Sequence, residues 1–452
     1  MHLGDSPLFI CRHLRSVPPL LISMSDEEKE DYESELARML SQEEESPGNK
    51  PMVYFADLYH KDHPKERIIE RLTEVITRNT KVQQHHVMLL APSANELNKI
   101  SQKTNIKDGN GITYHKIITD NKIQAFYEGK EFLDSNTLSR MAMVCACEQS
   151  GFWKQLGEMF FTKAYQMFFA VVGSGKMELT ASYGLECEVE AFLQALPSIG
   201  DIQILKSPLI PDAIFNHGFT TRNGGISSSP ALRSLNLAFA TRKRDSMLVI
   251  NENRRRLGDA AGFNSKNMQF PKVEHGNRVW SIGQDVPAGF DAIVTRSAGI
   301  TIAAPGADCV TILFADPVRR VCGATHAGWR GTLKGITIAT VQAMERDFGC
   351  DIGNIVVAMG PCLSANNLQF SPEDAKGFAD IDPSLVLHKE GDPKVYVDLL
   401  LANKILLQRV GIRQENIDTS AHRCTYDNPN EFYSFRRDKF PFGNQIAYIN
   451  IR

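Results

Sequence analysis

The feature that most constrains the fold is a pair of apolar runs within GADCVTILFADPVRRVCGATHAGWRGT, residues 306–332. The first run, residues 310–315, follows Cys309, and the second, residues 321–325, leads into His326. Asp316 and Pro317 between them are a turn signal, so the runs are expected to pair as neighbouring strands. The pairing would bring Cys309 close to His326. A thiolate beside an imidazole favours either a transition metal or nucleophilic chemistry.

A third ligand is expected because catalytic zinc takes three protein ligands and keeps one position open. His275 follows the segment FPKVE and precedes an expected strand at residues 278–282. His217 competes with it on spacing alone, because a lone histidine carries little information about its role. The residues by themselves therefore predict a site shared by Cys309 and His326, and they leave the third ligand open.

The composition is that of an ordinary globular chain. Its 452 residues are 42% hydrophobic and 23% charged, and this length suggests roughly two to four domains. A net charge of -3 gives no reason to expect nucleic acid or a polybasic membrane contact. Nine widely spaced cysteines favour a reducing compartment over a disulfide framework. No apolar run approaches the roughly 18 residues of a membrane-spanning helix, so we expect a cytoplasmic protein.

The chain is expected to divide into three parts. Residues 1–50 are predicted to be a disordered extension, a targeting signal or an alternative start, because residues 25–50 are acidic and have few large apolar groups. Residues 51–205 are predicted to form an α/β or α+β domain of unknown role, with docking of a metabolic enzyme as one role. Its expected strands are 52–55, 87–91, 122–127 and 167–172, and its expected helices are 93–101, 138–148 and 186–196.

The third part, residues 206–452, is expected to carry the chemistry. Its predicted helices are 248–257, 332–348 and 397–410, and a strand is predicted at 355–359. The arginine run at 254–256 lies on the first of these helices and is interpreted as a solvated face rather than a nucleic-acid patch. A strand from Phe215 runs into Gly224 and Gly225, where the backbone can approach a ligand closely.

Several sequence blocks of this third part occur together in one known family. The blocks are TTRNGG, SLNL, ENRRRL, ADCVTILFADP, THAGWRGT, GPC, RCTYDNPNEFYSFRRDK and GNQIAYINI. Over residues 215–452 the chain resembles the YfiH/YlmD family of multicopper polyphenol oxidase (laccase)-like proteins. The resemblance implies an α/β sandwich with a mixed sheet and a zinc ion bound by two histidines and a cysteine. These ligands fall on Cys309, His326 and, with one inserted residue in its block, His275.

The resemblance also implies an activity and its partners. The substrates would be purine nucleosides and phosphate, with phosphorolysis of adenosine, inosine, guanosine and S-methyl-5′-thioadenosine, together with adenosine deamination. Asp308 beside the site would then manage protons. Arg222, Arg436 and Arg437 are the candidates for binding phosphate. The implied setting is immunometabolic purine handling, in the cytoplasm or in association with the peroxisome or another organelle.

Two other functions remain as alternatives. A copper polyphenol oxidase, with Cu2+ in place of Zn2+, is what the family name suggests. Multicopper oxidases need many histidine ligands in His-x-His pairs, and none of the 12 histidines forms such a pair. The other alternative is a metabolic scaffold in which the N-terminal domain docks an enzyme and zinc only stabilises the fold.

Overall fold

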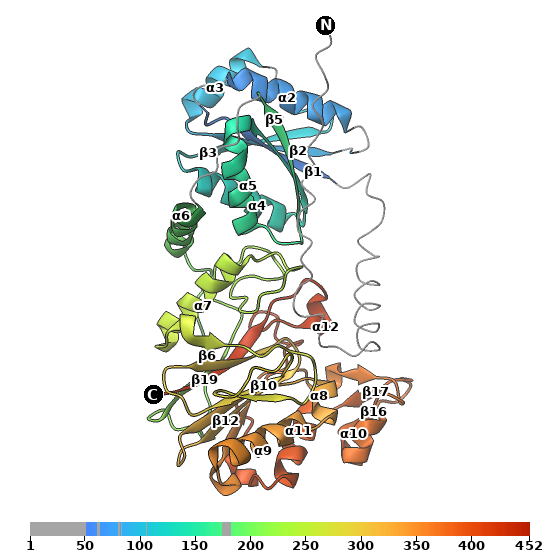
Figure 1. The fold of residues 1–452 in the computed structure, drawn as a ribbon. Coiled ribbons are helices and arrows are strands. Elements are labelled where there is room, and N and C mark those ends of the chain that lie inside the picture. Colours follow the sequence, from blue (N-terminus) through green and yellow to red (C-terminus); the bar gives the residue numbers. More distant parts are fainter. Residues whose placement is uncertain (1–50, 61–63, 80–81, 83, 105, 174–181) are drawn as a thin grey trace.

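The computed structural model describes residues 51–60, 64–79, 82, 84–104, 106–173 and 182–452. The predicted extension at residues 1–50 lies outside the described residues. Two units follow each other along the chain, the first at the top of Figure 1 in blue to green and the second below it in yellow to red. Within the described residues no helix is both long and apolar enough to cross a membrane.

The first unit is a parallel sheet covered by helices. Its strands follow the order β3-β2-β1-β4-β5, and every neighbouring pair is parallel. The elements alternate along the chain as β1 (Met52–Asp57), α2 (Lys65–Arg78), β2 (His85–Ala91), α3 (Ala94–Lys103), β3 (Ile112–Ile118), α4 (Lys122–Ser135), β4 (Arg140–Ala146), α5 (Ser150–Phe160), β5 (Gln166–Val172) and α6 (Ser182–Ala195). The predicted α/β class is confirmed.

Both faces of this sheet are buried, as a parallel sheet requires. In β1, Val53 and Phe55 belong to one apolar core, whereas Tyr54 and Ala56 belong to the core on the opposite face. The predictions for β1, β2, β5, α3 and α6 are confirmed. Their apolar runs and flanking turn residues were sufficient to identify them.

Two predictions in this unit were wrong. Residues 122–127 were expected to be a strand but begin helix α4, where the Asn121 side chain caps the amides of Ile123 and Gln124. Residues 138–148 were expected to be a helix but contain strand β4. Strand β4 is rich in alanine and methionine, which favour helices. Its position between β1 and β5, buried on both faces, overrides that local preference.

The second unit is built from three further sheets. A six-stranded mixed sheet has the order β18-β14-β12-β13-β10-β9, a five-stranded mixed sheet β6-β7-β19-β11-β8, and a small antiparallel sheet β15-β17-β16. The strands are β6 (Ile204–Leu205), β7 (Phe215–Thr220), β8 (Met268–Gln269), β9 (Val279–Ser281), β10 (Ala292–Thr295), β11 (Thr301–Gly306), β12 (Val310–Asp316), β13 (Val321–Ala327), β14 (Val356–Met359), β15 (Gln369–Phe370), β16 (Val386–His388), β17 (Val395–Val397), β18 (Ile417–Asp418) and β19 (Gln445–Ile451). Because β6 pairs with β7, this unit's sheet begins just before residue 206.

The helices of the second unit lie around these sheets (Figure 1). They are α7 (Met247–Ala261), α8 (Trp329–Leu333), α9 (Ile336–Phe348), α10 (Lys376–Ile381), α11 (Leu399–Arg409) and α12 (Phe435–Asp438). The single helix predicted at residues 332–348 is divided, because Gly335 adopts a left-handed φ of 80° between α8 and α9. The predicted helices at 248–257 and 397–410 correspond to α7 and α11.

The two large sheets of the second unit pack as a sandwich. In β12, Ile312 and Phe314 point into a core shared with the helices, and Leu313 points into the core shared with the other sheet. Burial on both faces explains why the run at 310–315 is continuously apolar. The predicted mixed-sheet sandwich is confirmed.

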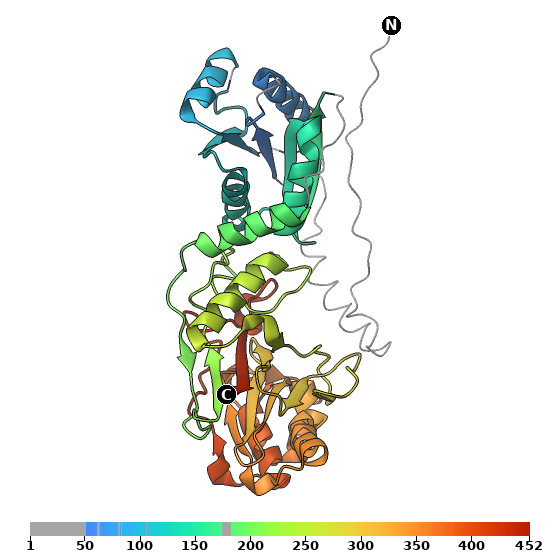
Figure 2. The ribbon, with the colours of Figure 1, turned by 60° about the vertical axis from the view of Figure 1, so that its left-hand side comes forward.

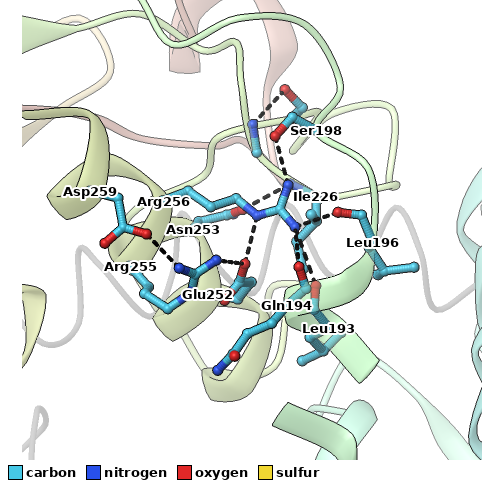
Figure 3. Close-up of polar contacts among 12 residues, drawn as sticks. Leu193, Gln194, Leu196, Ser198, Ile226, Glu252, Asn253, Arg255, Arg256 and Asp259 are labelled. Atoms are coloured by element: carbon cyan, nitrogen blue, oxygen red, sulfur yellow. Dashed lines mark hydrogen bonds and ion pairs between the residues drawn. The ribbon is translucent and has the colours of Figure 1, made fainter. Parts of the chain in front are cut away.

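Helix α7 also fastens the two units together, which corrects the interpretation of its arginines as a solvated face. Figure 2 shows α6 and α7 lying between the sheets of the two units. The Arg256 guanidinium does not face solvent. It donates hydrogen bonds to the carbonyls at the end of α6, those of Leu193, Gln194 and Leu196 (Figure 3). Arg254 lies over the Phe270 ring at 4.0 Å. The Arg255 side chain is 38% exposed, compared with 9% for that of Arg256, and it pairs with Glu252 and Asp259.

Candidate metal centre

Three side chains from separate segments meet in the second unit. Cys309 precedes β12, His326 lies near the end of β13, and His275 lies in the loop before β9. The antiparallel register pairs Thr311 with His326, which places the imidazole beside the start of β12. One ligand atom from each of the three residues lies within 4.8 Å of the others. The structure therefore brings together the three residues that the family resemblance named as ligands, and their binding of a metal stays a prediction.

His217, the competing candidate, does not belong to this group. It lies in β7 with no exposed surface, and its Nε2 accepts the amide of Ser207 at 3.1 Å. Its other ring nitrogen faces Asp212 at 3.6 Å. His217 is therefore a buried structural histidine.

Asp291 holds two of the three residues in place. Its carboxylate accepts a hydrogen bond from His326 Nδ1 at 2.8 Å, which leaves Nε2 of that ring available as a metal ligand. The same carboxylate accepts the amides of Glu274, His275 and Gly276, at 3.1, 3.1 and 2.9 Å. Asp291 is completely buried. A carboxylate that orients a ligand histidine is the usual second layer of a metal site.

In the absence of a metal, the two histidines have opposite tendencies to take up a proton. Burial and the positive charge of His326 lower the pKa of His275 to about 4, with further contributions from Arg330 and Lys334. Burial alone would also lower the pKa of His326, but the charge of Cys309 and the contact with Asp291 raise it to about 10. At neutral pH His275 is thus ready to bind a metal, whereas His326 must first lose a proton.

The backbone around the centre is strained and closely packed. His275 has φ 55° and Asp308, which precedes Cys309, has φ 100°. Such left-handed conformations are costly for residues other than glycine and are found mostly at functional sites. Gly328 leaves no room for a side chain, because a Cβ there would lie 2.7 Å from His275 Nδ1 and 3.2 Å from Cys309 Sγ.

Asp308 connects the centre to the C-terminal segment. Its carboxylate accepts the Thr425 hydroxyl at 2.7 Å and the amide of Arg436 at 2.6 Å. Burial raises its pKa, although these hydrogen bonds oppose the rise. Asp308, which directly precedes Cys309 in the sequence, therefore holds the main chain at Arg436. Its predicted part in proton transfer stays a prediction.

The three arginines predicted to bind phosphate have different surroundings. The Nε, Nη1 and Nη2 atoms of Arg222 donate hydrogen bonds to the main-chain carbonyls of Arg233, Pro429 and Pro230. Arg437 likewise donates to Thr425 and Phe432 carbonyls and to Asp438. Among the described residues, the guanidinium of Arg436 makes one long contact, to the Gln369 carbonyl at 3.5 Å. Arg436 is therefore the best placed of the three to bind a ligand.

A model of the multi-copper polyphenol oxidoreductase laccase family matches residues 216–452. The chain belongs to this family. The match covers nearly the same residues as the resemblance seen in the sequence, and it includes all three members of the candidate centre.

Curated family relatives carry names of purine enzymes. The mouse purine nucleoside phosphorylase LACC1 is 40% identical over 345 residues, which cover 73% of this chain and 80% of the relative. Purine nucleoside phosphorylase YlmD of Bacillus subtilis is 30% identical over 248 residues, 52% of this chain and 88% of the relative. Adenosine deaminase RL5, from an unknown prokaryotic organism, is 30% identical over 233 residues, 48% and 87% of the two chains.

The donor set of this family member fits a transition metal. Two imidazole nitrogens and one thiolate are ligands typical of zinc with an open position, and Asp291 supplies the orienting carboxylate. His275, Cys309 and His326 form the one such group of three found in the described part of the chain. A multicopper oxidase would need several copper centres. The ligand count therefore favours a single metal ion.

The roles of Asp291 and Gly328 at this centre could not be predicted from the sequence. Asp291 stands directly before the apolar strand β10, where an aspartate is easily taken for a turn residue. Its contacts with His326 and the 274–276 loop become apparent only once β10 pairs with β13. Gly328 follows His326 in the HAGWRG block, but the need for glycine arises from His275, a residue distant in sequence.

Proposed function

We propose that this protein is a zinc-dependent purine nucleoside enzyme. The observation that carries the proposal is the group His275, Cys309 and His326, whose ligand atoms lie within 4.8 Å of one another in a family of named purine nucleoside phosphorylases. Its main reaction would be phosphorolysis, in which a nucleoside and phosphate give the free base and ribose 1-phosphate. Adenosine deamination would be a second reaction, supported by the relative named adenosine deaminase RL5.

The three ligands would hold the zinc ion, and the rest of the site would prepare the substrate. When bound, zinc with an open position provides a Lewis acid and makes hydroxide available near neutral pH. Asp291 keeps the His326 ring turned so that Nε2 faces the centre. Gly328 keeps the space between His275 and Cys309 free of side-chain atoms.

Phosphate binding is proposed for Arg436. Its amide is fixed by Asp308, and a guanidinium offers a fork of donors that matches phosphate oxygens. Phosphorolysis needs phosphate near the ribose carbon, and the Arg436 guanidinium would hold it there. Arg222 and Arg437 would hold the surrounding backbone.

The proposed substrates are adenosine, inosine, guanosine and S-methyl-5′-thioadenosine. A direct test follows each substrate by chromatography, with and without phosphate, on the wild type and on Cys309→Ala. We expect release of base only with phosphate, inosine formation from adenosine without it, and loss of both in Cys309→Ala. Cys322→Ala, a buried cysteine at the other end of β13, is the matched control and should keep both activities. Equal turnover in Cys309→Ala would contradict the proposal.

A copper polyphenol oxidase is the second candidate, because two histidines and a cysteine also suit copper in electron-transfer sites. Stoichiometric copper with strong visible absorbance, together with oxygen uptake on phenols, would favour it over the zinc enzyme. The predicted immunometabolic setting and the predicted enzyme partner of the N-terminal unit stay predictions.

A further inference from the structure

The first unit has the topology of a small-molecule binding domain. Its parallel strands run in the order β3-β2-β1-β4-β5, so the chain winds outward in one direction from β1 to β3 and in the other from β4 to β5. In such sheets ligands bind at the carboxyl ends of the strands where the winding reverses. Here that point lies between β1 and β4.

The loops at this edge are joined by specific contacts. Asp57 is the last residue of β1, Lys122 the first residue of α4, and Gln149 follows β4. The Lys122 ammonium donates to Gln149 Oε1 at 2.7 Å, which connects the ends of β3 and β4. The Tyr59 hydroxyl donates to the Thr119 carbonyl at 2.6 Å, which connects the ends of β1 and β3. Segments far apart in the sequence therefore meet at one place.

Two opposite charges lie there around shared aromatic rings. The Asp57 carboxylate is 1% exposed and accepts Trp153 Nε1 at 2.8 Å and the Tyr59 amide at 2.9 Å. The Lys122 ammonium lies 5.7 Å from the centroid of the Tyr59 ring, 5.2 Å from that of Phe152 and 5.8 Å from that of Trp153. Both charges therefore contact only neutral groups in the described residues.

Asp134, another buried aspartate of the same unit, is an example of a buried charge with a structural role. Its carboxylate forms ion pairs with Lys130 at 2.6 Å and Arg244 at 3.2 Å, so two cations compensate its negative charge. A buried charge without a counterion is costly. Among the described residues, no cation contacts Asp57 as Lys130 and Arg244 contact Asp134, and no anion contacts Lys122 as Asp134 contacts Lys130. A ligand that brings both charges would complete the site.

We propose that this edge binds a phosphate-bearing metabolite together with a divalent cation, Mg2+. Magnesium is typically held by one or two carboxylates and by the phosphate of the ligand itself. The cation would bind Asp57, and the phosphoryl oxygens would bind both the cation and Lys122. The oxygen ligand distinguishes this site from the nitrogen- and sulfur-containing centre of the second unit, which favours zinc. The proposal is independent of the nucleoside chemistry.

The experiment uses the full-length, zinc-loaded protein and Mn2+ as a paramagnetic substitute for Mg2+. Free Mn2+ is counted by electron paramagnetic resonance with and without inorganic phosphate. We expect one Mn2+ per chain, bound about tenfold more tightly when phosphate is present, which corresponds to about 1.4 kcal/mol. Asp57→Asn should abolish this Mn2+ binding. Lys122→Met should keep the binding of Mn2+ but remove the effect of phosphate.

Exposed residues provide the controls. Asp201→Asn and Lys107→Met change the same charges at exposed positions away from this edge, Asp201 in the segment after α6 and Lys107 before the start of β3, and should leave Mn2+ and phosphate binding unchanged. Lys122→Met changes a half-buried side chain and is expected to fold. If phosphate still tightens Mn2+ binding in this variant, the proposal is overturned, even if Asp57→Asn fails to fold. Binding lost equally in the controls would show an adventitious ion only and would also overturn it. Nucleoside turnover, measured in parallel, should be unaffected by Lys122→Met, so a failure of the proposed function is seen separately.

Discussion

The two units of this protein build their candidate sites in different ways. In the second unit, Cys309 and His326 belong to one hairpin, β12–β13, and their proximity follows from the register of neighbouring strands. In the first unit, Asp57 ends β1, Lys122 begins the helix after β3, and Gln149 follows β4. A site made by a hairpin leaves a compact motif in the sequence. A site made at the edge of a parallel sheet leaves isolated residues that only the fold brings together.

The largest effect on metal content and turnover is expected from a substitution at Gly328, which packs against two of the candidate ligands. Gly328→Ala would place a Cβ 2.7 Å from His275 Nδ1 and 3.2 Å from Cys309 Sγ. Displacement of ligands by about 1 Å can cost about 100-fold in rate, so metal content and turnover should both fall by at least that order. The control is Gly184→Ala, where no atom of the described residues lies within 4 Å of the new Cβ. A variant at Gly328 with full metal content would break the account of this centre.

A large loss of stability is expected at the junction of the units. Asp134→Asn leaves the buried cations Lys130 and Arg244 without their shared carboxylate, at a cost of about 3 kcal/mol in the free energy of unfolding. Denaturant unfolding followed by circular dichroism measures the change. Asp259→Asn, which removes an exposed partner of Arg255, should cost well under about 1 kcal/mol. Similar costs for both variants would show that the buried cluster does not hold the units together.

A smaller effect is expected from the residue that orients the ligands. Asp291→Asn keeps the size of the side chain but removes the negative charge beside His326. Metal affinity should fall by about 10- to 100-fold, as measured by competition with a coloured chelator. An unchanged affinity would mean that the hairpin alone positions His326.

The smallest effect concerns pH. The pKa of His326 is raised to about 10 in the absence of metal, so a metal ion must displace a proton at any pH below that value. The affinity for zinc should therefore fall as the pH is lowered, by up to about tenfold for each pH unit between 8 and 7. Calorimetry in buffers of different ionisation enthalpy should also record proton release. Binding with no proton release and no pH dependence would contradict the assigned state of His326.

The sequence allowed the hairpin and the three candidate ligands to be predicted because their evidence is local. Strands β12 and β13 are apolar runs with a clear turn, and Cys309 and His326 stand at fixed positions beside them. His275 was the least constrained, since its approach depends on the loop that Asp291 holds. The family resemblance identified it where spacing alone could not.

Other features could not be predicted because distant contacts decide them. Strand β4 is rich in residues that favour helices, and its burial between β1 and β5 makes it a strand. The run at residues 254–256 has the charge of a solvated face, but Arg256 meets the end of α6 only after the two units have packed (Figure 3). Arg222 has the side chain expected of a phosphate-binding residue, but its guanidinium donates its hydrogen bonds to backbone carbonyls.

The central claim is that His275, Cys309 and His326 hold one zinc ion on which nucleoside turnover depends. The most direct test removes the metal with a chelator and adds zinc or copper back in steps while phosphate-dependent release of base from inosine is measured. The account predicts that activity returns in proportion to zinc and reaches its maximum at one ion per chain, whereas copper does not restore it. Full turnover by the metal-free protein, or recovery with copper alone, would contradict the claim.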